Sequence, residues 1–336
     1  GYTVAVQSSG KIVVAGRTTF SSGDDDIVLV RYNLDGTLDT TFGTNGITTT
    51  DFDSGLDEQE ARSIVILGDD KIVIGGSSDN NSANDFMVAQ FTADGILDSS
   101  FGDDGKVITP VGMGNEEGYS VQVQSDGKIV LSGYSFGDGG EEFALVRYNV
   151  DGSLDSTFGD DGIVSVLIGT NFSVGTSSAI QADNKILVGG FGRGASNIDF
   201  ALARFDENGE LDTAFSDDGY TFTDFNDGFD QCWAMALQQD GSIVLAGSSG
   251  AEYALARFLP NGDLDSSFGV DGKVLTGFSN SFDVALSLVI QPDGKIVAAG
   301  ISDNNPGEED FSLVRYNIDG SVDTTFGNSG IVVTNF

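Results

Sequence analysis

The hydrophobic residues of the chain fall into short runs separated by turn-forming residues. In residues 112–168 these runs are Ser120–Gln124, Lys128–Gly133, Phe143–Tyr148 and Ile163–Ile168, and each is rich in β-branched and aromatic residues. Gly, Asn and Asp bound every run, as is typical of β-strands. No segment has the sustained periodicity of an amphipathic helix. The pattern predicts units of four short antiparallel strands and no helices.

The four runs recur along the whole chain. The best preserved stretch, Arg147–Gly159, has close copies at 31–43, 90–102, 204–216, 257–269 and 315–327. A repeat of this length indicates a solenoid, a propeller or another array. The repeat units cover approximately residues 1–52, 53–111, 112–168, 169–225, 226–278 and 279–336.

Among repeat architectures, a β-propeller fits these units better than a sandwich, because each unit forms one small sheet. A solenoid requires capping units with altered faces, and neither the first nor the last unit has one. The 336 residues also exceed what a single core usually organises. We therefore expect an all-β fold, a six-bladed β-propeller with four antiparallel strands per blade, closed into a ring as one domain over residues 1–336.

The connections between strands are of two kinds. The links from strand one to strand two and from strand three to strand four carry Asp-Gly turns in nearly every unit, as at Asp126–Gly127 and Asp161–Gly162. The links from strand two to strand three, and from strand four to the next unit, vary in length and composition. Because alternate links of an antiparallel sheet emerge on opposite sides, we predict a repeated-turn face and a variable loop face. Recognition is expected at the loop face.

Three motifs connect the chain with a known family. They lie at Gln124–Val130, Phe143–Asn149 and Asp151–Gly159, and they resemble the delta-sixty-repeat propeller family of bacterial secreted and cell-surface proteins. The resemblance covers all the units. It implies an extracellular module of a larger protein, without a general catalytic assignment. Four positions depart from the repeat: Leu67, Gln90, Ser216 and Ser242.

The composition restricts the partners. The chain has 52 acidic and 15 basic residues and a net charge of -37, and only Arg17, Arg62 and Arg193 lie outside repeated cationic positions. Such a surface repels nucleic acid and anionic membranes, and no apolar run is long enough to insert into a bilayer. The acidity suits a secreted protein or one that holds hard cations, or it only maintains solubility.

Histidine is absent, which excludes Ser-His-Asp and Cys-His catalytic groups and zinc sites that contain histidine. Cys232 is the only cysteine, so no internal disulfide can form. The chain begins at Gly1 without Met and without a leader. We therefore expect a processed, monomeric module of a larger extracellular or cell-surface protein.

One aspartate occurs in every copy of the repeated stretch, in the pattern Leu/Val-Asp-x-x-Phe. We expect a structural role, either accepting backbone N–H bonds from the following turn or pairing with the strand-three arginine. A catalytic role is the alternative. The six residues are Asp39, Asp98, Asp155, Asp212, Asp265 and Asp323.

The turn before this aspartate spaces oxygen-bearing side chains at alternate positions, as calcium loops do. It lacks the terminal glutamate of such loops, and Asn-x-Asp-Gly also forms a plain turn. Calcium is the one cofactor that we consider. Its candidate ligands are Asn33, Asp35, Asp39, Asn149, Asp151, Asp155, Asn317, Asp319 and Asp323, and the acidic loop tips 24–26, 115–117, 141–142 and 308–310 are further candidates.

The predicted loop face also carries aromatic residues near Asn80, Asn81, Asn171, Asn304 and Asn305. Exposed rings beside amides and carboxylates suit sugar stacking or a peptide contact. Alternatively, individual rings seal the loops onto the blades. These aromatic residues are Phe20, Tyr134, Phe136, Phe172, Phe191, Phe229 and Phe282.

Together these features favour a non-catalytic recognition or spacer module that binds a glycan or a protein through the loop face, with calcium assistance as an option. The alternative from another class is a calcium-dependent propeller enzyme, lactonase-like or lyase-like, that uses carboxylates at the channel mouth. Carboxylates that converge from several blades would favour the enzyme, whereas scattered acidic loops would favour binding or spacing.

Overall fold

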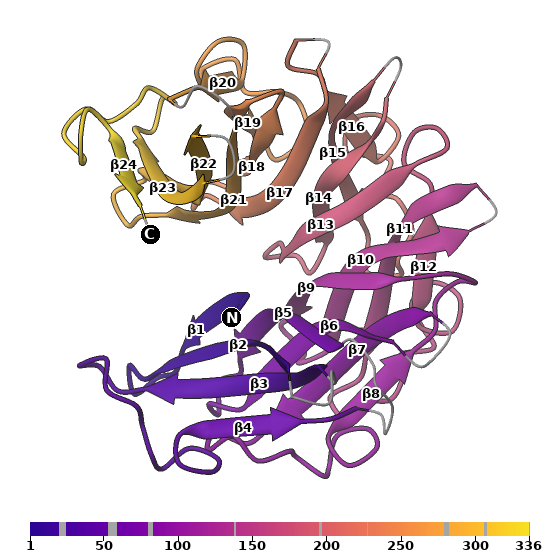
Figure 1. The fold of residues 1–336 in the computed structure, drawn as a ribbon. Coiled ribbons are helices and arrows are strands. Elements are labelled where there is room, and N and C mark those ends of the chain that lie inside the picture. Colours follow the sequence, from indigo (N-terminus) through magenta and orange to yellow (C-terminus); the bar gives the residue numbers. More distant parts are fainter. Residues whose placement is uncertain are drawn as a thin grey trace. The chain divides into compact units, whose positions relative to one another are not determined.

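The computed structural model describes residues 1–19, 25–52, 59–79, 83–137, 139–194, 197–226, 228–278, 282–305 and 308–335. The chain forms two compact units, Gly1–Val166 and Leu167–Phe336. Each unit contains three four-stranded sheets, and every sheet has its strands in sequence order with antiparallel neighbours (Figure 1). The described residues contain no helix, so none that could cross a membrane.

The first unit consists of three sheets. The first sheet contains β1 (Thr3–Val6), β2 (Ile12–Thr19), β3 (Asp25–Tyr32) and β4 (Ile47–Thr50). The second contains β5 (Gln59–Ile66), β6 (Ile72–Asp79), β7 (Asn84–Phe91) and β8 (Lys106–Thr109). The third contains β9 (Glu117–Val123), β10 (Ile129–Gly137), β11 (Gly140–Tyr148) and β12 (Ile163–Val166).

The second unit repeats this arrangement. Its first sheet contains β13 (Ser173–Ile180), β14 (Ile186–Arg193), β15 (Ile198–Phe205) and β16 (Tyr220–Thr223). The next contains β17 (Asp230–Leu237), β18 (Ile243–Ser249), β19 (Glu252–Phe258) and β20 (Lys273–Thr276). The last contains β21 (Phe282–Ile290), β22 (Ile296–Asn305), β23 (Glu308–Tyr316) and β24 (Ile331–Thr334).

These sheets confirm the predicted six-bladed β-propeller with four antiparallel strands per blade. Because the strands alternate in direction, each sheet has its repeated turns at one end and its variable loops at the other. We call these ends the repeated-turn face and the loop face. The expectations of a single domain over residues 1–336 and of ring closure stay predictions.

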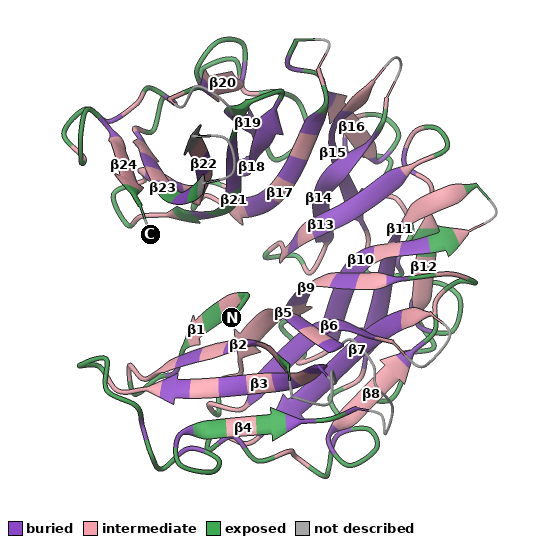
Figure 2. Cartoon of the chain, in the orientation of Figure 1, coloured by how far each residue is buried: buried purple, intermediate pink, exposed green. Residues whose placement is uncertain are grey.

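The core of each unit lies between its sheets. In the first unit, β5 packs across β1, β2 and β3, and the contact buries Ile27, Leu29, Ile72 and Ile74 completely. Strands β6 and β7 are buried along nearly their whole length, whereas β4 is largely exposed (Figure 2). The middle strands therefore pack on both faces, and the fourth strand forms an edge of the sheet.

Several predicted strand ends in the third sheet need correction. Strand β9 begins at Glu117, three residues before the predicted Ser120. Strands β10 and β11 extend to Gly137 and from Gly140, beyond the predicted 128–133 and 143–148, because Ser135 pairs with Glu142 and continues the hairpin. Strand β12 ends at Val166 instead of Ile168. The Ile168 N–H leaves the ladder and donates to the Ser173 hydroxyl at 3.1 Å.

Candidate functional site

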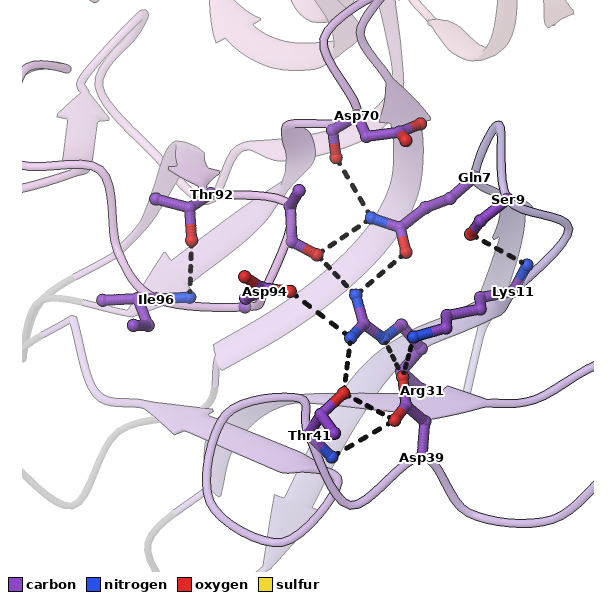
Figure 3. A network of polar contacts seen from close by, with 12 residues as sticks. Gln7, Ser9, Lys11, Arg31, Asp39, Thr41, Asp70, Thr92, Asp94 and Ile96 are labelled. Carbon is purple, nitrogen blue, oxygen red and sulfur yellow. Dashed lines mark hydrogen bonds and ion pairs between the residues drawn. The ribbon is translucent and has the colours of Figure 1, made fainter.

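The repeated stretch contains a carboxylate that performs both of its expected structural roles. In the first sheet, Asp39 Oδ1 accepts hydrogen bonds from the Thr41 N–H at 3.2 Å and from its hydroxyl at 2.7 Å. Asp39 Oδ2 binds Arg31 Nε at 2.7 Å and Lys11 Nζ at 2.8 Å. Figure 3 shows the four contacts converging on one side chain. The turn that contains Thr41 and the two cations therefore fix the position of the Asp39 carboxylate between the two repeated turns of this sheet.

These contacts stabilise the ionised form of the carboxyl group. Hydrogen bonds from Lys11 and Thr41 hold the pKa of Asp39 well below its usual range. In the second sheet, hydrogen bonds from Ser100 and Lys71 lower the pKa of Asp98 to about 2. A group with this environment stays ionised at neutral pH and does not act as a general acid or base there.

The arginine of the stretch also joins neighbouring sheets within each unit. Arg31 Nη1 donates to the Ala93 carbonyl of the second sheet at 2.6 Å, and Arg204 Nη1 donates to the Pro260 carbonyl at 2.8 Å. The Arg31 guanidinium also lies 4.7 Å from the centre of the Phe42 ring, which adds a cation–π contact. The repeated stretch therefore has a structural role, as expected.

The four departures from the repeat are tolerated locally. Gln90 replaces the arginine and donates to Asp98 Oδ2 at 3.2 Å. Ser216 takes the positive φ of 50° of the glycine that it replaces, and its N–H donates to the Asn261 carbonyl at 3.0 Å. Leu67 keeps the backbone bond to the Lys71 carbonyl at 2.9 Å. Ser242 stands where other sheets have the lysine, and Arg257 still pairs with the aspartate of that sheet, Asp265, at 2.8 Å.

The oxygens of the candidate calcium turns are used within the turns. Asp35 Oδ1 accepts from the N–H and the hydroxyl of Thr37 at 3.0 and 2.6 Å, and Asn33 Nδ2 donates to the same hydroxyl at 3.1 Å. The turns at 149–153 and 317–321 make the same contacts. Asp39, Asp155 and Asp323 each pair with a lysine and an arginine. This geometry favours the plain turn, and calcium at these residues stays a prediction.

The aromatic residues proposed for the loop face do not form one group. Phe136, Phe229 and Phe282 are exposed, and Tyr134 and Phe172 are half-buried. Phe191 is buried, so it was wrong to expect an exposed ring there. Phe191 packs between Phe172 and Trp233, with ring centres 5.9 and 5.4 Å away. Phe20, Asn80, Asn81 and the side chains of Asn304 and Asn305 lie outside the described residues.

The first strands of five sheets each contain a β-bulge that was not predicted from the sequence. At each bulge the pairing with the second strand shifts by one residue, and one residue of the first strand has no partner. A bulge redirects its side chain and is common beside binding and active sites. These bulge residues are Arg62, Tyr119, Thr176, Trp233 and Leu286.

The sequence does carry a signal for these bulges. The second strands have a glycine opposite each bulge, and a Cβ on Gly76 would lie 1.8 Å from the Glu60 carbonyl oxygen. The same conflict occurs at Gly133, Gly190, Gly247 and Gly300. Only glycine leaves room for the bulged backbone. The repeated glycine marks the bulge, while the bulge residue itself differs in every sheet.

In the first unit, the bulge residues belong to a charged cluster. Glu60 lies at its centre, with Arg17 Nη1 2.8 Å from Oε1 and Arg62 Nη2 2.7 Å from Oε2. Arg62 also reaches Glu117 at 3.1 Å and stacks 4.9 Å from the centre of the Tyr119 ring. Two of the three arginines outside repeated positions thus meet at partly exposed carboxylates.

Tyrosine hydroxyls complete this cluster. The Tyr119 hydroxyl donates to Glu117 Oε2 at 2.7 Å, and the Tyr2 hydroxyl donates to Glu60 Oε1 at 3.3 Å. Burial, and then the charge of Glu117, raise the pKa of Tyr119, so the hydroxyl keeps its proton. The cluster offers hydrogen-bond donors, acceptors and an aromatic face within a small area.

In the second unit, the equivalent positions are largely apolar. Trp233 is half-buried against Phe191, and Leu286 is 45% exposed. Thr176 is buried, and its hydroxyl donates to the Cys232 carbonyl at 2.8 Å. The two units therefore present different chemistry at equivalent positions, with charged groups and tyrosines in the first and aromatic and aliphatic groups in the second.

The links from strand four to the next sheet are more regular than the sequence suggested. In each link, a buried polar side chain within one residue of the start of the next sheet's first strand accepts a backbone N–H. The donor is the second residue after the end of the fourth strand. Gln59 Oε1 accepts from Phe52 at 2.9 Å, and Asp230 Oδ2 accepts from Phe225 at 2.7 Å. We call these residues junction anchors, and all are fully buried: Gln59, Glu116, Ser173, Asp230 and Asp283.

A family model of β-propeller repeats matches the chain in six segments. It is described as a domain of unknown function (DUF5122) beta-propeller, and it matches residues 7–42, 67–101, 124–158, 181–215, 238–268 and 291–326. The chain belongs to the DUF5122 β-propeller family. Each DUF5122 match begins at or near the first repeated turn and ends at the phenylalanine of the repeated stretch. The bulge residues precede the matched segments.

Among solved structures, the DUF5122 chain is similar to virginiamycin B lyase from Staphylococcus aureus, with a TM-score of 0.57 and 12% identity over 96% of this chain and 82% of that chain. A protein of unknown function from Bacteroides caccae has a TM-score of 0.52 and 12% identity over 98% and 99%. A streptogramin B lyase has a TM-score of 0.52 and 10% identity over 96% and 84%. At these identities the likeness concerns the fold alone. No match was found among curated proteins.

The family match supports a propeller repeat family, as the motifs indicated. The finer resemblance to delta-sixty-repeat proteins stays an expectation.

Proposed function

We propose that this chain is a non-catalytic recognition module whose bulge residues bind a glycan. The proposal rests on one observation about the bulges. The β-bulge in the backbone is repeated in five sheets, whereas the residue at the bulge is Arg, Tyr, Thr, Trp or Leu. A fixed scaffold with varied side chains is how propellers and other rigid folds carry recognition.

The chemistry of the bulge residues fits neutral, hydroxyl-rich ligands. Trp233 and Tyr119 offer aromatic faces on which a sugar ring can stack. Arg62, Glu60 and Glu117 supply donors and acceptors, and the two carboxylates pair with the guanidinium groups of Arg17 and Arg62. A neutral ligand can exchange hydrogen bonds with such a set without leaving a charge unpaired. A peptide ligand is the other outcome that we consider.

The chain's single tryptophan makes a direct test available. Trp233 is the only tryptophan, so its fluorescence reports on the second unit's bulge without any added label. We expect a saturable change in its emission on titration with at least one member of a panel of soluble polysaccharides. Calorimetry on the same panel should give the same affinity.

Substitutions separate recognition from folding. Arg62→Ala should weaken polysaccharide binding at the first unit and Trp233→Ala binding at the second, each by about tenfold or more, with the melting temperature nearly unchanged. Leu34→Ala is the matched control, because Leu34 is exposed at 78% on the repeated-turn face. Binding that survives both bulge substitutions, or that responds to peptides and not to polysaccharides, would contradict the glycan proposal.

An enzyme of the lyase type is less well supported. One of the similar solved structures is a catalytically inactive histidine-to-alanine variant of virginiamycin B lyase with quinupristin, whereas this chain has no histidine. The carboxylates of Glu60 and Glu117 are paired with arginine. Incubation of the chain with the panel should therefore release no product detectable by chromatography.

We also propose that the module acts outside the cell. The resemblance to delta-sixty-repeat proteins implies this location, and the net charge of -37 is compatible with it. Detection of the full-length protein on the surface of intact cells with an antibody against this chain would test the location.

A further inference from the structure

Three carboxylates converge at the junction between the first and second sheets of the second unit. Asp199 lies on β15, Asp224 follows β16, and Asp230 begins β17. One oxygen from each lies within 4.8 Å of the other two. Asp199 and Asp230 are 6% and 0% exposed, whereas Asp224 is exposed. Within the part of the chain that the structure describes, this is the one such group of three.

Asp230 is the member that points to a ligand. Its Oδ2 serves as the junction anchor by accepting the Phe225 N–H at 2.7 Å. Its other oxygen, Oδ1, is buried and has no hydrogen-bond partner. An unpaired oxygen on a buried carboxylate is costly, and a second and a third carboxylate nearby increase the cost.

The nearest cation does not satisfy this oxygen. Lys273 Nζ donates to the Asp224 backbone carbonyl at 2.9 Å and lies 5.9 Å from the centre of the Phe225 ring. The Ser249 hydroxyl also contacts Asp230, yet Oδ1 of Asp230 stays without a hydrogen-bond partner. One lysine therefore stands beside three acidic groups.

The first unit contains a matched junction without this conflict. There Lys106 Nζ donates to the Asp51 carbonyl at 2.9 Å and lies over the Phe52 ring, as Lys273 does at Asp224 and Phe225. The anchor, however, is Gln59. Its Oε1 accepts the Phe52 N–H at 2.9 Å, and its Nε2 donates to Asp51 Oδ1 at 3.0 Å. An amide N–H thus sits where the second-unit junction has an oxygen.

From this comparison we infer that Asp199, Asp224 and Asp230 form a binding site for one divalent cation, with Ca²⁺ as the preferred ion. Calcium takes carboxylate oxygens at about 2.3–2.6 Å, so three oxygens with the observed spacing can contact one ion. The ion replaces the amide N–H of the first-unit junction as the positive partner. It would tie the hairpin of β14 and β15 to the start of β17.

A glycine lies beside the site at the end of β14. Gly194 follows β14, and a Cβ at this position would lie 2.2 Å from Asp199 Oδ2. Glycine at this position therefore adds no side chain beside this oxygen. Because Asp224 is exposed, an ion can enter from solvent, and water can complete the six to eight oxygen ligands that calcium usually takes.

The test uses the full chain after removal of metal by a chelating resin. Calorimetric titration with CaCl₂ should show one specific site, and CaCl₂ should raise the melting temperature, which a chelator reverses. The isosteric variant Asp230→Asn should lose the calcium affinity by about tenfold or more, since the number of charged ligands sets the affinity of calcium sites. The same variant should stay folded without calcium, because its amide can donate as that of Gln59 does.

Two controls separate this site from general calcium attraction to an acidic surface. Asp218→Asn removes an exposed carboxylate from a repeated turn of the same sheet and should leave the titration unchanged. Terbium luminescence excited through Trp233, on the same strand as Asp230, should appear with the wild type and disappear with Asp230→Asn. Absence of calcium binding in the wild type, or equal binding in Asp230→Asn, would overturn the inference.

Magnesium binding that is lost in Asp230→Asn would keep the site and replace the preferred ion.

The converse change, at the matched junction of the first unit, should create a binding site. Gln59→Glu in the first unit replaces the amide by a carboxylate of the same shape beside Asp51. If the comparison is right, this variant should bind a second calcium ion, and an unchanged stoichiometry would count against it.

Discussion

Buried carboxylates have opposite surroundings on the repeated-turn face and on the loop face. On the repeated-turn face, the aspartate of the repeated stretch meets an arginine, a lysine and its own turn, as Asp39 does. On the loop face, anchors such as Glu116 and Asp230 meet mainly backbone N–H groups and other acids. The first arrangement stabilises the ionised carboxylate. The second raises the pKa of the carboxyl group, and at Asp230 it leaves Oδ1 without a hydrogen-bond partner. Perturbed carboxyl groups of this kind are common at functional sites.

Removal of a carboxylate on the repeated-turn face should have the largest effect. Asp155→Ala leaves Arg147 buried and removes the acceptor of both Arg147 and Lys128. Breaking a buried ion pair in this way costs about 3 kcal/mol or more of the free energy of unfolding. Urea denaturation of the purified chain would measure the loss.

The second sheet provides the control for this prediction. There Gln90 stands in place of the arginine, so Asp98→Ala leaves no buried guanidinium behind. The loss should be about 1 kcal/mol, as for an ordinary hydrogen bond. Equal losses in the two variants would show that the arginine contributes nothing specific.

The glycine opposite a bulge should be the next most sensitive position. Gly76→Ala would place a Cβ 1.8 Å from the Glu60 carbonyl oxygen, so the two strands must separate. We expect a loss of about 2 kcal/mol, typical of overpacking. The matched variant is Gly68→Ala in the repeated turn of the same sheet, where a Cβ meets no atom within 4 Å.

Thermal unfolding of the two variants would compare the faces directly. Gly68→Ala should change the free energy of unfolding by less than about 0.5 kcal/mol. A similarly large loss at Gly68 would mean that the glycines are needed for flexibility and not for space at the bulge.

Acid should weaken the repeated-turn face first. The pKa of Asp98 is lowered to about 2 in the folded chain, below about 3.9 in an unfolded one. As the pH falls, the unfolded state therefore takes up the proton first, and the contribution of Asp98 is lost between about pH 4 and pH 2. The melting temperature should fall over this range, and the fall should be smaller in Asp98→Asn. Identical pH profiles would contradict the prediction.

How far the sequence predicts these features depends on whether they repeat. The strands, the turns and the pairing of Arg31 with Asp39 were predictable, because strand pattern and partners recur in every copy or nearly so. The contact between Lys11 and Asp39 was not predicted, since it joins two separate turns that only the folded sheet brings together. The bulge at Trp233 was missed because it changes the register of the backbone without interrupting the strand pattern.

The junction anchors were hidden for another reason. The donor and the anchor are five positions apart in four links and seven apart at Phe52 and Gln59, and the anchor can be Gln, Glu, Ser or Asp. A function fulfilled by several residue types leaves no repeated motif in the sequence. The calcium site inferred above depends on this variation, because it requires an acid where the first unit has an amide.

The smallest expected effect concerns an anchor outside that site. Burial raises the pKa of Glu116, and the charge of Asp85 adds to the rise, although the N–H groups of Val111 and Gly112 lower it. The folded chain therefore binds this proton more tightly than the unfolded chain, and the contribution of Glu116 declines as the pH rises through its folded pKa. This sign is opposite to that of Asp98. In Glu116→Gln the decline should be absent, so the variant should gain stability relative to the wild type as the pH rises above the ordinary glutamic acid pKa of about 4.3. Asp104→Asn, which removes an exposed carboxylate of the same unit, should track the wild type over the whole range. If Glu116→Gln instead loses stability most at high pH, the charge of Glu116 is stabilising. The two faces would then not differ in whether they stabilise an ionised carboxylate.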